Sequence, residues 1–332
     1  MQSPETFPTL DDDAILQLNK DGKLRHLLTL KGLDRKTVVD LLDEAQRFVS
    51  PLGSAAVRNS SLAGRTVANL FFEPSTRTRA SFDLAAKRLG ADVLNLDVNT
   101  SSRKKGESIL DTIYTLQAMQ VDIMVIRDAS AGVPAFITRN VGDHISILNA
   151  GESDLSHPTQ GLLDLLTIRQ RLGDFADLTV AIVGDIAHSR VARSAVQGLH
   201  TLGAGEIRLI SPPALAPEMG EMPYAKIMHN LDDGLRDANV VMALRIQRER
   251  IADLDGIPNV DDYFSNFGIT QKRLKQAASN VIVMHPGPMN RGIEIESTLA
   301  DSRSSVITQQ VTNGVAVRMA ILERVSKAMA SI

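Results

Sequence analysis

Short apolar runs alternate with segments of helical spacing along nearly the whole chain of 332 residues. Each run is long enough for one strand, and the segment that separates it from the next is long enough for a helix. This alternation is typical of α/β proteins, in which helices connect neighbouring strands of a parallel sheet. Because the chain is about twice as long as a usual domain, we expect two domains.

The apolar runs form two series, one in each half of the chain. Strands are expected at 66–72, 92–96, 121–126 and 145–149, and then at 178–183, 207–210, 240–244 and 281–284. Helices are expected between them, including a leucine-rich helix at 159–172 between the two series and a final helix at 310–329. We predict two doubly wound α/β domains, each with a central parallel sheet flanked by helices, bridged by interdomain helices. The expected boundaries are 1–155 with 310–332 for the first domain, and 156–309 for the second.

The composition excludes several kinds of chemistry. The chain has no cysteine and no tryptophan, and its formal net charge is −3. Without cysteine it forms no disulfide, thiolate zinc site or iron–sulfur cluster, and it has no cysteine nucleophile. A small negative charge gives no drive toward nucleic acid. With no tryptophan and only three tyrosines, we expect no platform for stacked bases.

No targeting or membrane segment is recognisable. The first 13 residues are acidic and lack a long apolar run, so we expect no signal peptide. No stretch approaches the roughly 20 apolar residues that a membrane helix needs. Histidines and carboxylates show no metal-ligand spacing. We therefore expect a cytoplasmic enzyme without metal, cofactor, nucleic-acid partner or membrane partner.

A dense cluster of polar side chains follows the first expected strand. The sequence over 71–79 reads Phe-Phe-Glu-Pro-Ser-Thr-Arg-Thr-Arg. Ser75 is a good helix N-cap, and the free N–H groups of a first helical turn attract anions. Cations at a helix start oppose its dipole, so they are not there to stabilise the helix. We expect Ser75, Thr76, Arg77 and Thr78 to bind a phosphate; a capped helix with a solvated basic turn is the alternative.

Two further strand ends in the first half carry cations. The loop 99–107 combines hydroxyls with Arg103, Lys104 and Lys105, and it fits either a charged surface loop or a mobile lid that brings Lys105 to an anion. Arg127 is expected just after the strand 121–126. Because the carboxyl ends of parallel strands share one sheet edge, Arg127 would lie beside the Ser75 cluster.

A histidine and a glutamine follow the last strand of the first series. The sequence over 156–160 is Ser-His-Pro-Thr-Gln, and Pro158 suits the first turn of a helix. This would hold His157 and Gln160 at the helix start, where His157 can polarise a carbonyl oxygen. A histidine that only caps the helix is the alternative.

The second half carries polar groups at three strand ends. The segment 183–190 lacks G-x-G-x-x-G, which disfavours a dinucleotide, and it places Arg190 at a helix start. Arg245 and Gln247 follow the strand 240–244. The residues 284–292 form a rigid turn after the last strand. Together Arg190, Arg245 and Gln247 would suit a small dicarboxylate, whereas each alone would be an ordinary surface group.

Three of these motifs, in this order, resemble aspartate carbamoyltransferase catalytic chains of the aspartate/ornithine carbamoyltransferase superfamily. They are Phe-Phe-Glu-Pro-Ser-Thr-Arg-Thr-Arg, His-Pro-Thr-Gln and Arg-x-Gln-x-Glu-Arg, and the similarity spans about residues 24–322. The first two motifs mark carbamoyltransferases in general, and Arg245-x-Gln247 marks the aspartate branch. The ornithine branch would carry a cysteine motif near His285 and an acidic amine-binding motif, whereas this chain has His-Pro-Gly-Pro and no cysteine.

The resemblance implies a role for each matching residue. The phosphate of carbamoyl phosphate would be held by Ser75, Thr76, Arg77, Thr78 and Arg127. Thr78, Arg127 and His157 would contact the carbamoyl oxygen, and Gln160 the carbamoyl amide. The backbone carbonyls of Pro286 and Gly287 would contact the carbamoyl amide and the incoming amine. Ser101 and Lys105 would come from the neighbouring subunit, and Lys105, Arg190, Arg245 and Gln247 would bind L-aspartate.

The resemblance also implies an assembly and a reaction. Active sites would be shared in a homotrimer, and a larger assembly with regulatory or dihydroorotase-like chains is possible through the amino-terminal lead-in. The reaction would give N-carbamoyl-L-aspartate and phosphate, an early step of pyrimidine biosynthesis. Family members often have Leu where Gly287 stands; we expect this to be tolerated, because the contact uses the backbone. A carbamoyltransferase with another acceptor, such as ornithine, and a silent anion-binding assembly subunit are the alternatives.

Overall fold

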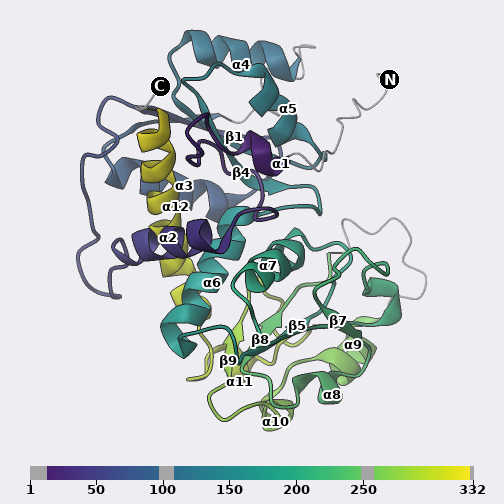
Figure 1. Ribbon diagram of the computed structural model, residues 1–332. Helices are drawn as coiled ribbons and strands as arrows, with labels where there is room; N and C mark the ends of the chain where they lie inside the picture. Colours follow the sequence, from purple (N-terminus) through teal and green to yellow (C-terminus); the bar gives the residue numbers. More distant parts are fainter. Residues whose placement is uncertain (1–12, 97–107, 248–257, 330–332) are drawn as a thin grey trace. The chain divides into compact units, whose positions relative to one another are not determined.

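The computed structural model describes residues 13–96, 108–247 and 258–329 (Figure 1). The chain divides into two compact units, one of residues 1–159 with 312–332 and one of residues 160–311. Each unit contains one parallel sheet flanked by helices, so the predicted fold class is confirmed. Both boundaries fall inside helices, α6 (Pro158–Leu172) and α12 (Ile307–Met329), which carry the chain from one unit to the other.

The first unit is built on four parallel strands in the order β2-β1-β3-β4. The strands are β1 (Thr66–Phe71), β2 (Asp92–Leu96), β3 (Ile123–Asp128) and β4 (Ser146–Glu152). The helices are α1 (Asp13–Leu16), α2 (Arg35–Gln46), α3 (Thr76–Arg88), α4 (Ile109–Ala118) and α5 (Val133–Asn140). The inward face of α3 is buried, because Phe82, Ala85, Ala86 and the C-cap residue Leu89 are all inaccessible to solvent.

The second unit has five parallel strands in the order β7-β6-β5-β8-β9. They are β5 (Thr179–Val183), β6 (Glu206–Ile210), β7 (Lys226–Met228), β8 (Val240–Ala243) and β9 (Ile282–Met284). The remaining helices are α7 (Arg190–Thr201), η2 (Pro213–Leu215), α8 (Leu231–Leu235), α9 (Val260–Phe267), α10 (Gln271–Leu274) and α11 (Ser297–Ala300). Its core packs apolar residues of β5 and β8 against α8 and α9.

Two strands of the first unit end later than the sequence pattern predicts. β3 runs through Arg127 to Asp128, so Arg127 lies within the strand and not after it. β4 continues to Glu152 although its apolar run stops near Asn149. The extension is stabilised from outside the sheet, because the Asn149 N–H donates to Leu27 O and its side chain donates to Leu28 O at 2.8 Å. The periodicity of the sequence does not predict these hydrogen bonds, because Leu27 and Leu28 are distant from β4 in sequence.

Helices were expected between the strands, but several elements were not located individually. Helix α5, the three-residue edge strand β7 and the helices α8 to α11 are too short or too polar to give a periodic signal. Within the described residues, no helix is long and apolar enough to cross a membrane.

His26 is a buried titratable group that makes the stability of the first unit depend on pH. Its Nδ1 accepts a hydrogen bond from the Ile147 N–H at 2.9 Å. Burial lowers the pKa of His26 from its ordinary 6.5 to about 3, and the neighbouring Arg25 guanidinium acts in the same direction. The folded protein therefore keeps His26 neutral where the unfolded chain would bind a proton.

We expect the free energy of unfolding to fall as the pH drops from 6.5 toward 3, by at most about 1.4 kcal/mol per pH unit through this group. Above pH 6.5 both states are neutral at His26, and the effect disappears. His26→Gln retains an acceptor for the Ile147 N–H but does not titrate. Urea unfolding of both proteins at pH 7.5 and pH 5 should show about 2 kcal/mol less acid destabilisation in the variant. Equal pH dependence in the two proteins would contradict this assignment.

Candidate functional site

Each sheet has one place where the chain leaves neighbouring strands in opposite directions. In the first unit this place lies between β1 and β3, and in the second between β5 and β8. Connecting helices diverge there and leave the carboxyl ends of the strands open, which is where parallel sheets bind ligands. The predicted site residues of each unit follow these strands or their immediate neighbours.

The loop from β1 into α3 carries the predicted phosphate-binding residues. Ser75 is the N-cap residue, as predicted, but its side chain makes no capping hydrogen bond. The N–H groups of Thr76, Arg77 and Thr78 precede the first intrahelical bond, from the Arg79 N–H to Ser75 O at 3.3 Å. The Ser75 hydroxyl therefore does not satisfy the N–H groups of this first turn. Thr76 and Arg77 are exposed and Thr78 is buried.

Arg127 lies directly beside this loop. The parallel register pairs it with Phe71, the last residue of β1. Its guanidinium is buried, with Nη1 donating to Ala150 O at 3.1 Å and Nη2 to Glu73 Oε1 at 2.7 Å. The contact with Glu73 neutralises a cation that would otherwise be desolvated without a counter-charge. Arg127 thus bridges the ends of β1 and β4.

The end of β4 orders the segment that leads to His157. Glu152 Oε1 accepts from the Gly132 N–H, and its Oε2 accepts from Asn149 Nδ2 at 3.0 Å. The Ser156 hydroxyl donates to Leu28 O at 3.2 Å. His157 follows, buried, one residue before α6 begins at Pro158. The predicted place of His157 at a helix start is confirmed.

Ser101 and Lys105 lie outside the described residues. The roles that the sequence suggests for them therefore stay predictions. Among the residues that the structure does describe, no group of three or more His, Asp or Glu side chains is arranged to hold a metal ion.

Asp185 organises the carboxyl edge of the second sheet. It follows β5, is completely buried, and accepts the backbone N–H of Gln247 on Oδ2 at 2.9 Å. Its Oδ1 lies 2.8 Å from His188 Nδ1, and Gln247 Nε2 donates to His188 O at 2.9 Å. Asp185 therefore holds Gln247 directly, through the Gln247 backbone N–H. It also acts indirectly, through His188, whose carbonyl oxygen accepts from the Gln247 side chain. Sequence reasoning missed both Asp185 and His188; the signal was an acid directly after a buried strand.

The two arginines expected to bind carboxylates lie at the same edge. Arg190 is the first residue of α7 and is buried, and its helix is capped by the Ser189 hydroxyl, which accepts from the Ala192 N–H at 3.1 Å. Arg245 is half-buried, two residues after β8. A side chain on Gly184, at φ +137°, would overlap Leu244 O, so only glycine allows the ends of β5 and β8 to approach so closely.

The turn after β9 contains Pro286 and Gly287. Gly287 has φ +69°, in the left-handed region that favours glycine. Glycine fits this backbone conformation at a position where the resemblance leads one to expect Leu. Gln160, in the first turn of α6, is buried, and its Nε2 donates to Asp164 Oδ1 at 3.0 Å.

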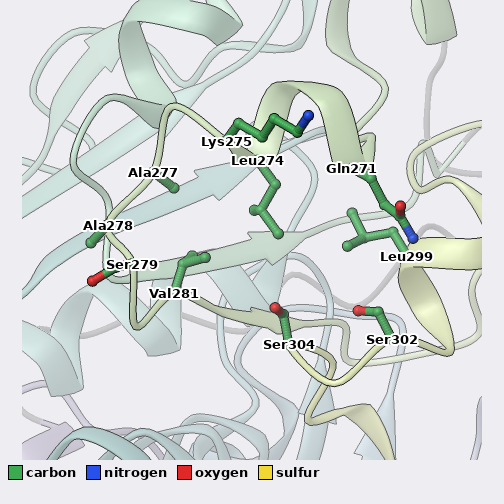
Figure 2. Close-up of a pocket in the computed structure, with 10 residues that line it drawn as sticks. All are labelled: Gln271, Leu274, Lys275, Ala277, Ala278, Ser279, Val281, Leu299, Ser302 and Ser304. Carbon is green, nitrogen blue, oxygen red and sulfur yellow. The ribbon is translucent and has the colours of Figure 1, made fainter.

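A pocket of about 330 Å³ lies elsewhere in the second unit (Figure 2). It is lined by α10, by residues 277–281 that precede β9, and by Leu299, Ser302 and Ser304. These residues lie at the amino-terminal end of β9, whereas Pro286 and Gly287 follow its carboxyl end. None of the predicted site residues lines this pocket.

Comparisons with known proteins agree with the fold and identify the family. Residues 25–170 match the family model "Aspartate/ornithine carbamoyltransferase, carbamoyl-P binding domain", and residues 176–325 match the "Asp/Orn binding domain" of the same name. A solved aspartate transcarbamoylase from Trypanosoma cruzi, in complex with carbamoyl phosphate and aspartate, is 30% identical. It has a TM-score of 0.80, and the match covers 90% of this chain and 96% of that one.

A second solved structure is similar at a comparable level. It is the ornithine carbamoyltransferase from Gloeobacter violaceus, with 27% identity, a TM-score of 0.74 and coverage of 91% of this chain and 98% of that one. Relatives with either acceptor thus share the fold of this protein. Because the two family models together match most of its length, this chain belongs to the aspartate/ornithine carbamoyltransferase family.

Proposed function

We propose that this chain transfers the carbamoyl group of carbamoyl phosphate to the amino group of L-aspartate. The products would be N-carbamoyl-L-aspartate and phosphate, and the former carries atoms of a pyrimidine ring. The choice of aspartate rests on one observation: the carboxyl edge of the second sheet presents Arg190, Arg245 and Gln247, and Gln247 is held in place by buried Asp185. Two guanidiniums and an amide suit two carboxylates, and they would repel the ammonium of an ornithine side chain.

Phosphate binding is supported by the first unit. The uncapped start of α3 offers N–H groups and the hydroxyls of Ser75 and Thr76, and Arg77 adds an exposed guanidinium. An incoming phosphate would also compete with Glu73 for Arg127, because both are anions suited to the same guanidinium face. Binding would exchange the ion pair with Glu73 for one with phosphate, so the buried Arg127 guanidinium would stay paired.

The reaction needs stabilisation of negative charge. The aspartate amine attacks the carbamoyl carbon, the C–N bond forms, and charge grows on the carbonyl oxygen before the C–O bond to phosphate breaks. Thr78, Arg127 and His157 are the proposed donors to that oxygen, and each such donor is worth about 3 kcal/mol in comparable sites. Holding both substrates in attack geometry supplies roughly 7–11 kcal/mol more. The departing phosphate would accept the amine proton.

The homotrimer with shared sites and the contributions of Ser101 and Lys105 remain predictions from the resemblance. The cytoplasmic location remains a prediction from the sequence. A larger assembly with regulatory or dihydroorotase-like chains also stays a prediction.

The acceptor is the decisive test. The purified chain would be incubated with labelled carbamoyl phosphate and either L-aspartate or L-ornithine. Label in carbamoyl-aspartate alone is the expected result. Label in citrulline would overturn the assignment of Arg190, Arg245 and Gln247, and transfer to neither acceptor would contradict activity of this chain on its own.

Ser75→Ala tests the separation of capping from phosphate binding. Because the Ser75 hydroxyl makes no capping bond, the free energy of unfolding should change by less than about 0.5 kcal/mol. The Kd for inorganic phosphate, measured by calorimetry, should rise about fivefold through loss of a hydrogen bond.

The matched control is Ser108→Ala at the start of α4. There the hydroxyl does cap the helix, accepting from the Asp111 N–H at 3.1 Å, so a loss of about 1 kcal/mol is expected. A similar loss of stability in both variants would show that Ser75 acts as a cap.

Gln247→Glu tests the dicarboxylate site. The new carboxylate should repel aspartate and raise its KM at least about tenfold, while the KM for carbamoyl phosphate changes less than about twofold. Steady-state kinetics with each substrate varied would measure both. The control is Gln276→Glu in the same unit. It also removes an Nε2 donor, the one that Gln276 directs at Asp232, and it should alter neither KM. An unchanged KM for aspartate in Gln247→Glu would remove this residue from the site.

A further inference from the structure

A buried chain of hydrogen bonds in the second unit connects Gln160 with the turn that contains Gly287. Its members are Asp164, Gln310, His285 and Glu294. They lie on α6, on α12 and around the end of β9, and each is at most 2% exposed. Polar side chains buried in this way are held by hydrogen bonds to one another, since unpaired polar groups are costly in an interior.

Asp164 fixes which way two amides point. Gln160 Nε2 and Gln310 Nε2 both donate to its Oδ1, at 3.0 and 2.8 Å. A carboxylate accepts and does not donate, so each amide must turn its NH2 group toward Asp164. The carbonyl oxygen of each amide therefore points elsewhere. For Gln310 that oxygen accepts from the backbone N–H of His285 at 2.9 Å.

The hydrogen bonds of His285 continue this fixed order of donors and acceptors into the turn that contains Gly287. Its Nδ1 accepts from the Gly287 N–H at 2.8 Å and therefore carries no proton. The proton of the neutral ring is on Nε2, which donates to Glu294 Oε1 at 3.0 Å. With its N–H engaged by His285, the Gly287 peptide has a set orientation, and Glu294 also accepts from the Asn290 N–H across the same turn.

We propose that Asp164, acting through Gln310 and His285, is a positioning residue that makes the carbamoyl subsite a set of hydrogen-bond acceptors. The inference rests on the proposed function, in which Gln160 and the backbone of Pro286 and Gly287 contact the carbamoyl NH2. With its NH2 directed to Asp164, Gln160 presents its Oε1 to that group. The turn presents carbonyl oxygens in an orientation set by His285. The subsite then selects for a substrate amide with N–H donors.

Acetyl phosphate distinguishes this role from simple structural support. It has a methyl group where carbamoyl phosphate has NH2, and it is otherwise of the same size and charge. A subsite of oriented acceptors rejects it, because the acceptors are left unpaired. Loss of the orientation should therefore weaken carbamoyl phosphate while changing acetyl phosphate little. General damage to the fold would weaken both ligands equally.

The test is Gln310→Met, which keeps the side-chain volume and removes both hydrogen bonds. The full chain would be assayed with saturating aspartate for the KM of carbamoyl phosphate, and for the Ki of acetyl phosphate as a competitor. We expect that KM to rise at least fivefold and that Ki to change less than twofold. Should Gln310→Met not fold, Gln310→Asn keeps the amide but is too short to reach both partners, and the same direction is expected.

The control is Gln309→Met, one residue earlier in the same helix. Gln309 also uses both ends of its amide, accepting from Arg171 Nε at 2.7 Å and donating to Gln170, outside the buried chain. Gln309→Met should leave the ratio of the Ki of acetyl phosphate to the KM of carbamoyl phosphate unchanged. An equal rise of both constants in the Gln310 variants, or no rise in either, would overturn the proposal. Failure of the unmodified chain to transfer carbamoyl groups would instead overturn the proposed function.

Discussion

Parallel pairing of β1 with β3 and of β5 with β8 is the constraint on which both candidate subsites depend. At these pairs the connections leave in opposite directions, which is the place where a parallel sheet leaves the carboxyl ends of its strands open to a ligand. The register of β1 with β3 sets Phe71 opposite Arg127, which brings a guanidinium to the loop that starts α3. In the second sheet Gly184 allows the end of β8 to approach β5 closely enough for Asp185 to hold the backbone of Gln247.

Desolvated polar groups at these edges are stabilised by pairing. Arg127 has the Glu73 carboxylate and Ala150 O, and Asp185 has the Gln247 N–H and the His188 ring. Burial also raises the pKa of the Tyr263 hydroxyl, and the carboxylates of Glu294 and Asp185 act in the same direction, so this group stays neutral near the second sheet. Networks of this kind cost stability when one member is removed, because the partner is left buried and unpaired.

The sequence predicted what local pattern determines. Strand β2 follows from the short apolar run at 92–96, and the place of Ser75 and His157 at helix starts follows from N-cap and proline preferences. Arg127 was predicted to follow β3 but lies within it, because the length of β3 depends on pairing with its neighbours. Asp164 and Gln310 were missed although Asp164 is an isolated acid on a leucine-rich helix. Asp164 and Gln310 are 146 residues apart in sequence, and no local pattern reveals such a pair.

The two units contribute different kinds of interaction to the proposed reaction. The first offers charge and helix N–H groups, which attract an anion strongly but select poorly among phosphates and carboxylates. The second adds oriented amides and carbonyls, whose polarity depends on Asp164 and Asp185. A ligand that leaves a buried polar group of the site unpaired loses more binding free energy than a ligand that only lacks a contact. In the proposed reaction, affinity for the phosphoryl donor would therefore come mainly from charge, and choice of the carbamoyl group from hydrogen-bond direction. Choice of the acceptor would combine the charge of Arg190 and Arg245 with the amide of Gln247.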